Sequence, residues 1–220
     1  MIGAIVPAKA LDEAKTRLAT ILTEDGRRCL ALAMLNDVLR TLQAVPRLEL
    51  IAAVSPDEAV LECAQELGAE GIREPPSVRG INQALAHALG VMSPRELSAL
   101  LVLLADVPAV TPAEIESVLD ALPDDRGAVI CPSSAGGTSA LAVRPADAMA
   151  FRFGPDSFNG HKAGAEERGV PLWVLHIDSL SRDIDEPDDL LYLLAHPAET
   201  ATHRLLRQLK LGDRWITRAD

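Results

Sequence analysis

Three groups of side chains in this 220-residue chain have types and spacings suited to phosphate chemistry. The first is the segment Pro7–Arg17, which carries two of the four lysines of the chain, Lys9 and Lys15, together with Arg17. It contains no glycine, so neither the GxGxxG nor the GxxxxGK[ST] phosphate loop is present. This absence disfavours a NAD-binding Rossmann domain and a P-loop NTPase. The segment can place positive charge on a polyphosphate, or it can be an ordinary solvated basic loop.

Acidic side chains form the second group. Asp106 follows the apolar run Ala99–Ala105, and a carboxylate at the end of a buried strand can hold Mg²⁺ or a ribose hydroxyl, or can cap a turn. Asp183 and Asp185 are two residues apart, so in extended backbone they project to the same side. Two like charges so close cost free energy unless a cation lies between them. A cap of the helix that begins at Pro187 would explain only one of these two acids.

The third group consists of two small-residue turns with hydroxyl groups, which lie between these acids in the chain. One turn contains Thr138, and the other contains Gly154 and Ser157. If a helix begins near Asp156, its first N–H groups form an anion site. Each turn is common in isolation, and His161 could contact the same ligand or only support it. Together the three groups predict a metal-dependent site for a nucleoside triphosphate and a second small anion.

The elements that must position these groups alternate between apolar strands and helices. We expect strands at 2–6, 48–54, 71–74, 99–105, 128–131, 140–143 and 172–176. We expect helices at 23–44, 57–67, 80–91, 111–122, 156–168, from 187 onward and at 198–211. This alternation predicts an α/β domain with a mostly parallel sheet, in which ligands bind beyond the carboxyl ends of the strands.

Composition narrows the class of protein. The chain has 21 basic and 32 acidic residues, a net charge of −11 and few aromatic residues, which disfavours nucleic-acid binding. Apolar runs fall far short of the roughly 20 residues that span a membrane, and the first residues do not resemble a signal peptide. The three cysteines show no metal-binding or disulfide spacing. We therefore expect a cytoplasmic protein without nucleic-acid or membrane partners, and a homodimer as the default assembly.

Several segments, in order along nearly the whole chain to about residue 195, carry a resemblance to a known family. They are Val6–Lys9 with Ala14–Leu18, Val54–Asp57, Gly80–Ala84, Leu104–Pro108, Gly136–Thr138, Phe153–Phe158 with His161, and Asp183–Leu190. The ordered set resembles the CofC/FbiD guanylyltransferases of coenzyme F420 biosynthesis.

The resemblance implies a fold and a reaction. The fold is α/β and GT-A-like, that is, Rossmann-like, with a mostly parallel mixed sheet flanked by helices. We expect it to form one nucleotidyltransferase domain over 1–220, with the acceptor-binding part near 133–180 and a terminal helix and tail near 198–220. The reaction transfers GMP from GTP to a small phosphorylated three-carbon acid and releases pyrophosphate. The acid is phosphoenolpyruvate, 2-phospho-L-lactate or 3-phosphoglycerate.

The resemblance also implies roles for individual residues. The Mg²⁺ ligands would be Asp106, Asp183 and Asp185, and the acceptor contacts would be Thr138, Gly154 and Ser157. The catalytic residues would be Lys15, Arg17 and Asp106. The GTP side would be formed by Pro7, Ala8, Lys9, Lys15, Ser55, Asn82 and Asp106. Ser139 stands where the family pattern leads us to expect Asn, which puts one acceptor or backbone contact in doubt.

Three other functions stay open at this point. A molybdopterin guanylyltransferase or a sugar-phosphate nucleotidyltransferase would share the basic loop and the acids but bind a larger acceptor. A non-catalytic nucleotide-binding regulator would not need the Asp183 and Asp185 pair. A NAD-dependent enzyme would need the missing glycine fingerprint.

Overall fold

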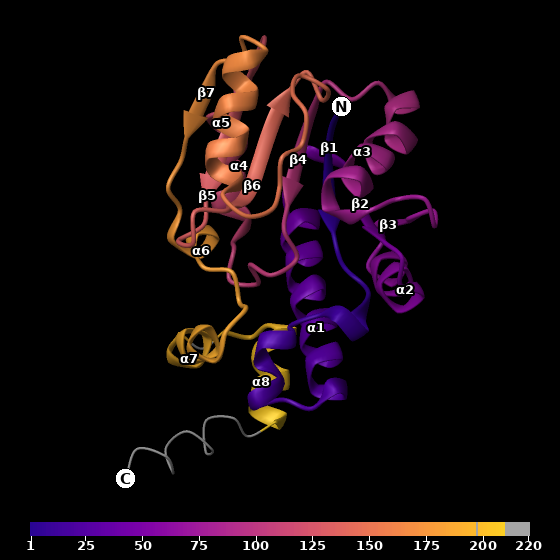
Figure 1. Cartoon of the computed structure of the whole chain (residues 1–220), viewed down its shortest axis with the longest axis vertical. Coiled ribbons are helices and arrows are strands. Elements are labelled where there is room, and N and C mark those ends of the chain that lie inside the picture. Colours follow the sequence, from indigo (N-terminus) through magenta and orange to yellow (C-terminus); the bar gives the residue numbers. More distant parts are fainter. Residues whose placement is uncertain (197, 210–220) are drawn as a thin grey trace.

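The computed structural model describes residues 1–196 and 198–209, in which seven strands form one sheet (Figure 1). The strand order is β3-β2-β1-β4-β6-β5-β7. The bounds are β1 (Ile2–Pro7), β2 (Leu48–Ser55), β3 (Glu70–Arg73), β4 (Ala99–Leu103), β5 (Gly127–Pro132), β6 (Thr138–Arg144) and β7 (Leu172–Val174). Strand β6 runs antiparallel to its neighbours β4 and β5, and the other adjacent pairs are parallel. The predicted mixed, mostly parallel sheet is therefore confirmed.

Helices cover both faces of the sheet. One face is packed by α1 (Glu24–Gln43), α2 (Glu58–Glu66), α4 (Pro112–Asp120) and α6 (Asp178–Ser181). The other is packed by α3 (Gly80–Met92) and α5 (Ser157–Glu167). Helices α7 (Pro187–Ala195) and α8 (Ala201–Gln208) pack with α1 around a third apolar cluster, near the lower end of Figure 1. Short 3-10 helices lie at η1 (Leu11–Glu13), η2 (Thr16–Thr20) and η3 (Ser93–Arg95).

The central strand β4 explains why the apolar runs of this sequence are strands. All five of its residues are fully buried. Leu101 and Leu103 pack toward one helical layer, and Leu100 and Val102 pack toward the other. A strand enclosed between two helical layers has no polar face, so it is apolar at every position rather than at alternate positions.

Side-chain caps fix the start of two predicted helices. The Thr23 hydroxyl accepts a hydrogen bond from the N–H of Gly26 at 3.1 Å, which starts α1 as expected. Thr111 and Glu114 form the predicted capping box of α4. Such caps satisfy N–H groups that have no partner within the helix, so short polar motifs locate these boundaries well.

The structure differs from the sequence prediction at several boundaries. Strand β4 ends at Leu103 rather than at 105, because the chain turns there toward Asp106. Strand β7 ends at Val174 rather than at 176. Helix α8 begins only after Thr200, because Asp37 of α1 accepts hydrogen bonds from the first N–H groups of that helix. Positions 210–220, which include the predicted end of this helix and the tail, lie outside the described residues. Helix α6 and the 3-10 helices were not predicted.

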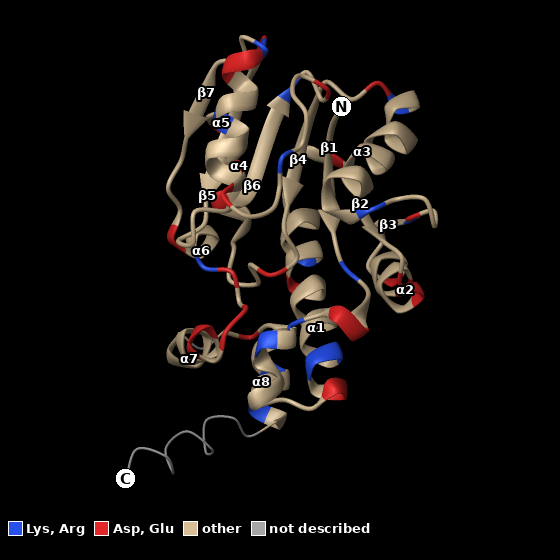
Figure 2. Cartoon of the chain, in the orientation of Figure 1, with Lys and Arg blue, Asp and Glu red and all other residues tan. Residues whose placement is uncertain are grey.

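The carboxyl ends of β1, β2 and β4 meet at one edge of the sheet, since these strands are parallel. Figure 2 shows acidic segments before α7 and basic segments of the loop after β1 at this same, lower end of the sheet.

Among the described residues, no helix has both the length and the apolar character needed to cross a membrane.

Candidate active site

Lys15 lies between two of the carboxylates that we predicted to bind metal. Its Nζ is 3.0 Å from Oδ2 of Asp106 and 3.2 Å from Oδ1 of Asp185, and its side chain is only 10% exposed. The backbone of Lys15 is left-handed, with φ of 51°. Non-glycine residues keep this conformation only where the surrounding structure imposes it. The solvated-loop alternative is therefore wrong for Lys15.

Two buried leucines anchor the loop that carries Lys15. Leu11 and Leu18 are almost fully buried and lie in η1 and η2. The N–H of Leu11 donates to Oδ2 of Asp57 at 2.9 Å, which ties η1 to the start of α2. Arg27 of α1 donates to the carbonyl of Ala14 at 3.1 Å. Packing on both sides of Lys15 thus fixes the direction of its side chain.

The other two cations of this loop are more exposed. Nη1 of Arg17 is 3.4 Å from both Oδ2 of Asp185 and Oε1 of Glu186, but the Arg17 side chain is 66% exposed. Ion pairs so accessible to water stabilise a protein little. Lys9 is exposed and forms no ion pair within the described part of the chain. The buried positive charge of the site is therefore that of Lys15.

The net effect of burial and neighbouring charges is to raise the pKa values of both Lys15 and Asp183. Burial by itself would lower the pKa of Lys15, but attraction to Asp106 and Asp185 and hydrogen bonds to both outweigh it, so the pKa is raised. Lys15 is therefore a cation at neutral pH. Burial, reinforced by repulsion from Asp106 and Asp185, raises the pKa of the Asp183 carboxyl. The ionised form of Asp183 is thus disfavoured until a further positive charge reaches it.

The carboxyl group of Asp106 has an oxygen that no described residue engages. Oδ1 of Asp106 is buried and has no hydrogen-bond partner among the described residues. The N–H of Ile184 donates to the carbonyl of Asp106 at 2.9 Å, which brings the Asp183–Asp185 segment against the end of β4. Carboxylate oxygens are suitable ligands for Mg²⁺. Among the described residues, no group of three or more His, Cys, Asp or Glu side chains is arranged to hold a metal ion. Between Asp106 and Asp185 lies the ammonium group of Lys15 instead.

Helix capping does not account for the acid pair. The N-cap of α7 is Glu186, and the Asp189 carboxylate accepts hydrogen bonds from the N–H groups of Asp185 and Glu186. The Asp185 carboxylate instead pairs with the cations of the basic loop. Ile184 is buried between the two aspartates, as the extended spacing predicted. Asp183 and Asp185 are therefore free of a capping role.

The two hydroxyl turns come together beside the acids. The N–H of Phe158 donates to the carbonyl of Gly136 at 3.3 Å, which joins the start of α5 to the turn before β6. The N–H of Ser157 donates to the carbonyl of Gly154, so the prediction of free N–H groups at this helix start is wrong. In place of free N–H groups, the two turns carry two buried hydroxyl groups, those of Thr138 and Ser157, and each of these residues is 2% exposed.

Backbone contacts hold these turns next to the metal-binding candidates. The N–H of Leu104, two residues before Asp106, donates to the carbonyl of Ser139 at 3.0 Å. The N–H of Ser134 donates to the carbonyl of Ser181, two residues before Asp183, at 2.7 Å. The loop between β5 and β6 is thus attached to both acidic segments. The Ser139 hydroxyl is buried without a partner within the described residues.

Two residues that we predicted on the GTP side have structural partners within the protein. The buried Ser55 hydroxyl accepts from the N–H of Asp57 at 3.1 Å. The Asn82 amide makes two hydrogen bonds to the backbone of Phe153, at 2.9 and 2.7 Å. Pro7 ends β1, and the N–H of the next residue, Ala8, donates to the carbonyl of Val54. The polar side chains of Ser55 and Asn82 are thus engaged within the protein.

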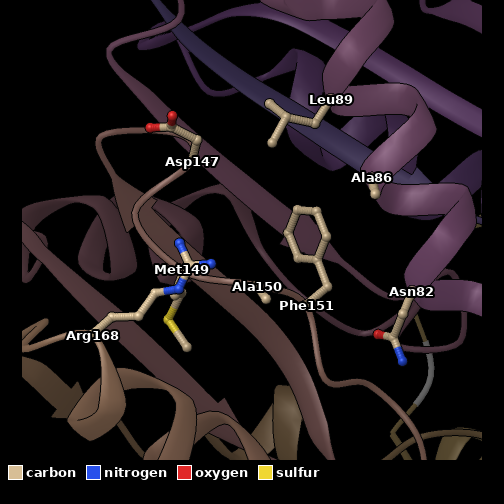
Figure 3. A pocket seen from close by; sticks show the side chains of 8 residues that line it. All are labelled: Asn82, Ala86, Leu89, Asp147, Met149, Ala150, Phe151 and Arg168. Atoms are coloured by element: carbon tan, nitrogen blue, oxygen red, sulfur yellow. The ribbon is translucent and has the colours of Figure 1, made fainter.

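A separate pocket of about 300 Å³ lies between α3 and the segment that precedes α5 (Figure 3). Its lining residues are Asn82, Ala86, Leu89, Asp147, Met149, Ala150, Phe151 and Arg168. Asn82 is the one predicted site residue in this lining. The phosphate and metal candidates therefore belong to the strand-end site and not to this pocket.

His161 had no firm role in the sequence analysis, but in the structure it contacts Thr138, one of the predicted acceptor residues. His161 is fully buried on α5, and its Nδ1 is 3.0 Å from Oγ1 of Thr138. The one signal in the sequence was its position, one turn after Ser157 in the predicted helix.

Known proteins match nearly the whole length of the chain. A family model described as "Guanylyl transferase CofC like" matches residues 2–215. A phosphoenolpyruvate guanylyltransferase of Sphaerobacter thermophilus is 41% identical over 194 residues, which cover 88% of this chain and 92% of that protein. A 2-phospho-L-lactate guanylyltransferase of Methanothermobacter thermautotrophicus is 35% identical over 207 residues, which cover 94% of this chain and 90% of that protein.

Solved structures share the fold at low sequence identity. A nucleotide-diphospho-sugar transferase from Desulfovibrio desulfuricans superposes with a TM-score of 0.73 at 18% identity and covers 94% of both chains. A nucleotidyl transferase from Methanothermobacter superposes with a TM-score of 0.67 at 16% identity, covering 94% of this chain and 99% of that one. The GT-A-like nucleotidyltransferase fold is thus confirmed. On the family match and the identity to its members, the chain belongs to the CofC-like guanylyl transferases.

Proposed function

We propose that this protein transfers GMP from GTP to phosphoenolpyruvate or a closely related phosphorylated three-carbon acid, and that it acts in coenzyme F420 biosynthesis. Relatives that are named phosphoenolpyruvate guanylyltransferases and are 36–41% identical support this acceptor. The observation that carries the reaction is the buried Lys15 ammonium between Asp106 and Asp185, beside two hydroxyl turns. This arrangement offers one cation for a polyphosphate and neutral donors for a second anion.

The reaction needs no covalent enzyme intermediate. A phosphate oxygen of the acid attacks the α-phosphorus of GTP in line, and the bond from that phosphorus to the bridging oxygen of the β-phosphate breaks. The electron pair leaves with pyrophosphate. The nucleophile is already an anion, so the protein must position two polyanions and stabilise the charge that moves to the leaving group.

Each residue then has a defined task. Lys15 is held in place before the substrates arrive and is suited to stabilise the triphosphate and the leaving pyrophosphate. Arg17 lies at the exposed rim and can follow the leaving group outward. Asp106, Asp183 and Asp185 would hold Mg²⁺, which when bound neutralises and orients the phosphate oxygens. The partnerless Oδ1 of Asp106 and the raised pKa of Asp183 support this assignment.

The charge of the whole chain makes this local arrangement necessary. A net charge of −11 repels a nucleoside triphosphate and a phosphorylated acid at long range. A preformed cation at the strand ends compensates for this repulsion where the reaction takes place.

The direct test is to incubate the purified protein with GTP and Mg²⁺ and each of the three phosphorylated acids separately. We expect pyrophosphate release and a trapped guanylylated acid, with phosphoenolpyruvate the best acceptor and with ATP, CTP and UTP much poorer donors. Omission of the acid and replacement of Mg²⁺ by EDTA are the controls. Equal turnover with ATP contradicts the proposed donor, and turnover only with sugar phosphates or molybdopterin contradicts the proposed acceptor.

Changing Ser157 to alanine should weaken the acceptor side selectively. A hydrogen bond to a charged group contributes about 1.5–3 kcal/mol, so KM for the phosphorylated acid should rise by roughly 10- to 150-fold. KM for GTP should change little, because Ser157 lies on the turn beside Thr138 and not on the Lys15 loop. Ser117→Ala on α4 is the matched control. A rise in KM for GTP alone would show that Ser157 belongs to the GTP subsite and not to the acceptor subsite.

A further inference from the structure

The tautomer of His161 follows from its two contacts. Its Nε2 is 3.0 Å from the backbone nitrogen of Arg152, and that N–H can only donate, so Nε2 carries a free lone pair. Burial lowers the pKa of His161 to about 4, so the ring is neutral at physiological pH. A neutral imidazole has one hydrogen, which must therefore be on Nδ1.

This tautomer fixes the direction of the next hydrogen bond. Nδ1 of His161 is 3.0 Å from Oγ1 of Thr138, so the ring donates and the hydroxyl oxygen accepts. The hydroxyl hydrogen of Thr138 is then left to point elsewhere. Among the described residues, Oγ1 of Thr138 has no hydrogen-bond partner other than His161. The Thr138 hydroxyl is thus a donor without an acceptor of its own.

The surroundings hold the imidazole in this orientation. The Phe153 ring packs against it edge to face, with ring centroids 4.8 Å apart and an angle of 75° between the ring planes. The backbone of Phe153 is in turn held on both its N–H and its carbonyl by the Asn82 amide. Rotation of the ring by a half turn would put a carbon where Nε2 now accepts from the Arg152 N–H.

We propose that His161 is a positioning residue of the acceptor subsite, which fixes the Thr138 hydroxyl as a hydrogen-bond donor to an oxygen of the phosphorylated acid. This inference rests on the proposed function and names the residue that orients one donor of its acceptor subsite. A hydroxyl that accepts from His161 keeps its own hydrogen for another acceptor, such as a carboxylate or phosphate oxygen. An anionic oxygen is the strongest acceptor for this donor, because hydrogen bonds to ionised groups are stronger than those between neutral groups.

Two substitutions separate the two ends of the imidazole. In His161→Asn the side-chain amide can donate from the place of Nδ1, whereas in His161→Gln the side-chain oxygen can accept from the place of Nε2 but the donor to Thr138 is lost. We expect His161→Gln to raise KM for phosphoenolpyruvate by roughly 3- to 10-fold, as for loss of one hydrogen bond. KM for GTP should stay unchanged, and His161→Asn should restore most of the parent KM for phosphoenolpyruvate.

A double-mutant cycle distinguishes positioning from general support of the fold. If His161 acts through Thr138, the His161→Gln change should cause no further rise in KM in a Thr138→Val background. The matched control is His203 on α8, also buried, whose Nδ1 is 2.8 Å from Oγ1 of Thr200. His203→Gln should lower the melting temperature without altering either KM.

Nitrogen-15 spectra of the imidazole test the tautomer without any turnover. In the parent, Nδ1 should carry the hydrogen and Nε2 should not, with no change between about pH 6 and about pH 8. Three results would overturn the proposal: a hydrogen on Nε2, an unchanged KM for phosphoenolpyruvate in His161→Gln, or the same rise in that KM when His161→Gln is added to Thr138→Val.

If the unmodified protein releases no pyrophosphate, the proposed function is refuted instead. The positioning role is then decided by calorimetric binding of phosphoenolpyruvate, which His161→Gln must weaken.

Discussion

Changing Lys15 to methionine should lower kcat for pyrophosphate release by about 10²–10³-fold, since loss of one preorganised stabiliser of developing charge costs about 2.7–4 kcal/mol. Methionine keeps much of the apolar stem, so the change removes mainly the charge. The substrates should still bind, because Arg17 and the acceptor hydroxyls are untouched. Steady-state assays with GTP and phosphoenolpyruvate measure this effect.

The same variant should also be less stable, which would not be expected of a solvated loop residue. Without the ammonium group, Asp106 and Asp185 face each other with no buried positive charge between them. The pKa of Lys15 is raised, so in the parent this stabilisation is complete at neutral pH and is lost only above 10.5, as the pH passes the raised value. Melting curves should therefore show a lower Tm for Lys15→Met, partly restored by Mg²⁺. Arg40→Met, an exposed cation of α1, is the control, and an unchanged kcat in Lys15→Met refutes the role of Lys15.

Changing Asp183 to asparagine should reduce pyrophosphate release by more than about 10²-fold and weaken its dependence on Mg²⁺, because a bound metal ion contributes several kcal/mol of charge stabilisation. Asparagine keeps the shape of the side chain and removes one charge. Asp188→Asn, on the exposed surface of α7, is the matched control. Parent-like turnover in both Asp183→Asn and Asp185→Asn would make this acid pair structural.

The stability of the Asp183 variant should change in the opposite direction to its activity. The pKa of Asp183 is raised above its ordinary value of 3.8, chiefly by burial, so the ionised carboxylate costs free energy in the folded state. That cost is present above the raised pKa and disappears as the pH falls toward 3.8. In EDTA, Asp183→Asn should therefore melt higher than the parent at neutral pH, and the difference should vanish in acid. Calorimetry over this pH range measures it.

Local sequence patterns predicted the elements and several site residues. The buried strand before Asp106, the caps at Thr23 and Thr111 and the alternation around Ile184 each depend on neighbours within a few positions. Periodicity and capping chemistry are readable at that range. From these patterns we predicted Asp106 just after a buried strand and Asp183 and Asp185 just before a helix. The structure has all three at these positions.

Contacts between distant segments could not be predicted in this way. The left-handed backbone of Lys15 is imposed by packing on α1 and by Asp57, which no local pattern reveals. The same holds for the contact between Thr138 and His161, 23 positions apart, and for Asp37 at the start of α8. Each depends on the surrounding tertiary structure rather than on the propensity of the residue itself.

The reversed direction of β6 has an evolutionary consequence. Because β5 and β6 are antiparallel neighbours, a short hairpin joins them at the end of the sheet where β4 also ends, whereas a parallel pair would need a crossover of about a dozen residues. The residues of this hairpin are anchored by the pairing of β6 with both β4 and β5, not by a helix of their own. If the hairpin contacts the acceptor as we propose, insertions and exchanges in it would alter acceptor preference, while the sheet register and the acids after β4 and before α7 stay in place. On the proposed function, this division would let one scaffold diversify toward new phosphorylated acids without changes to its sheet.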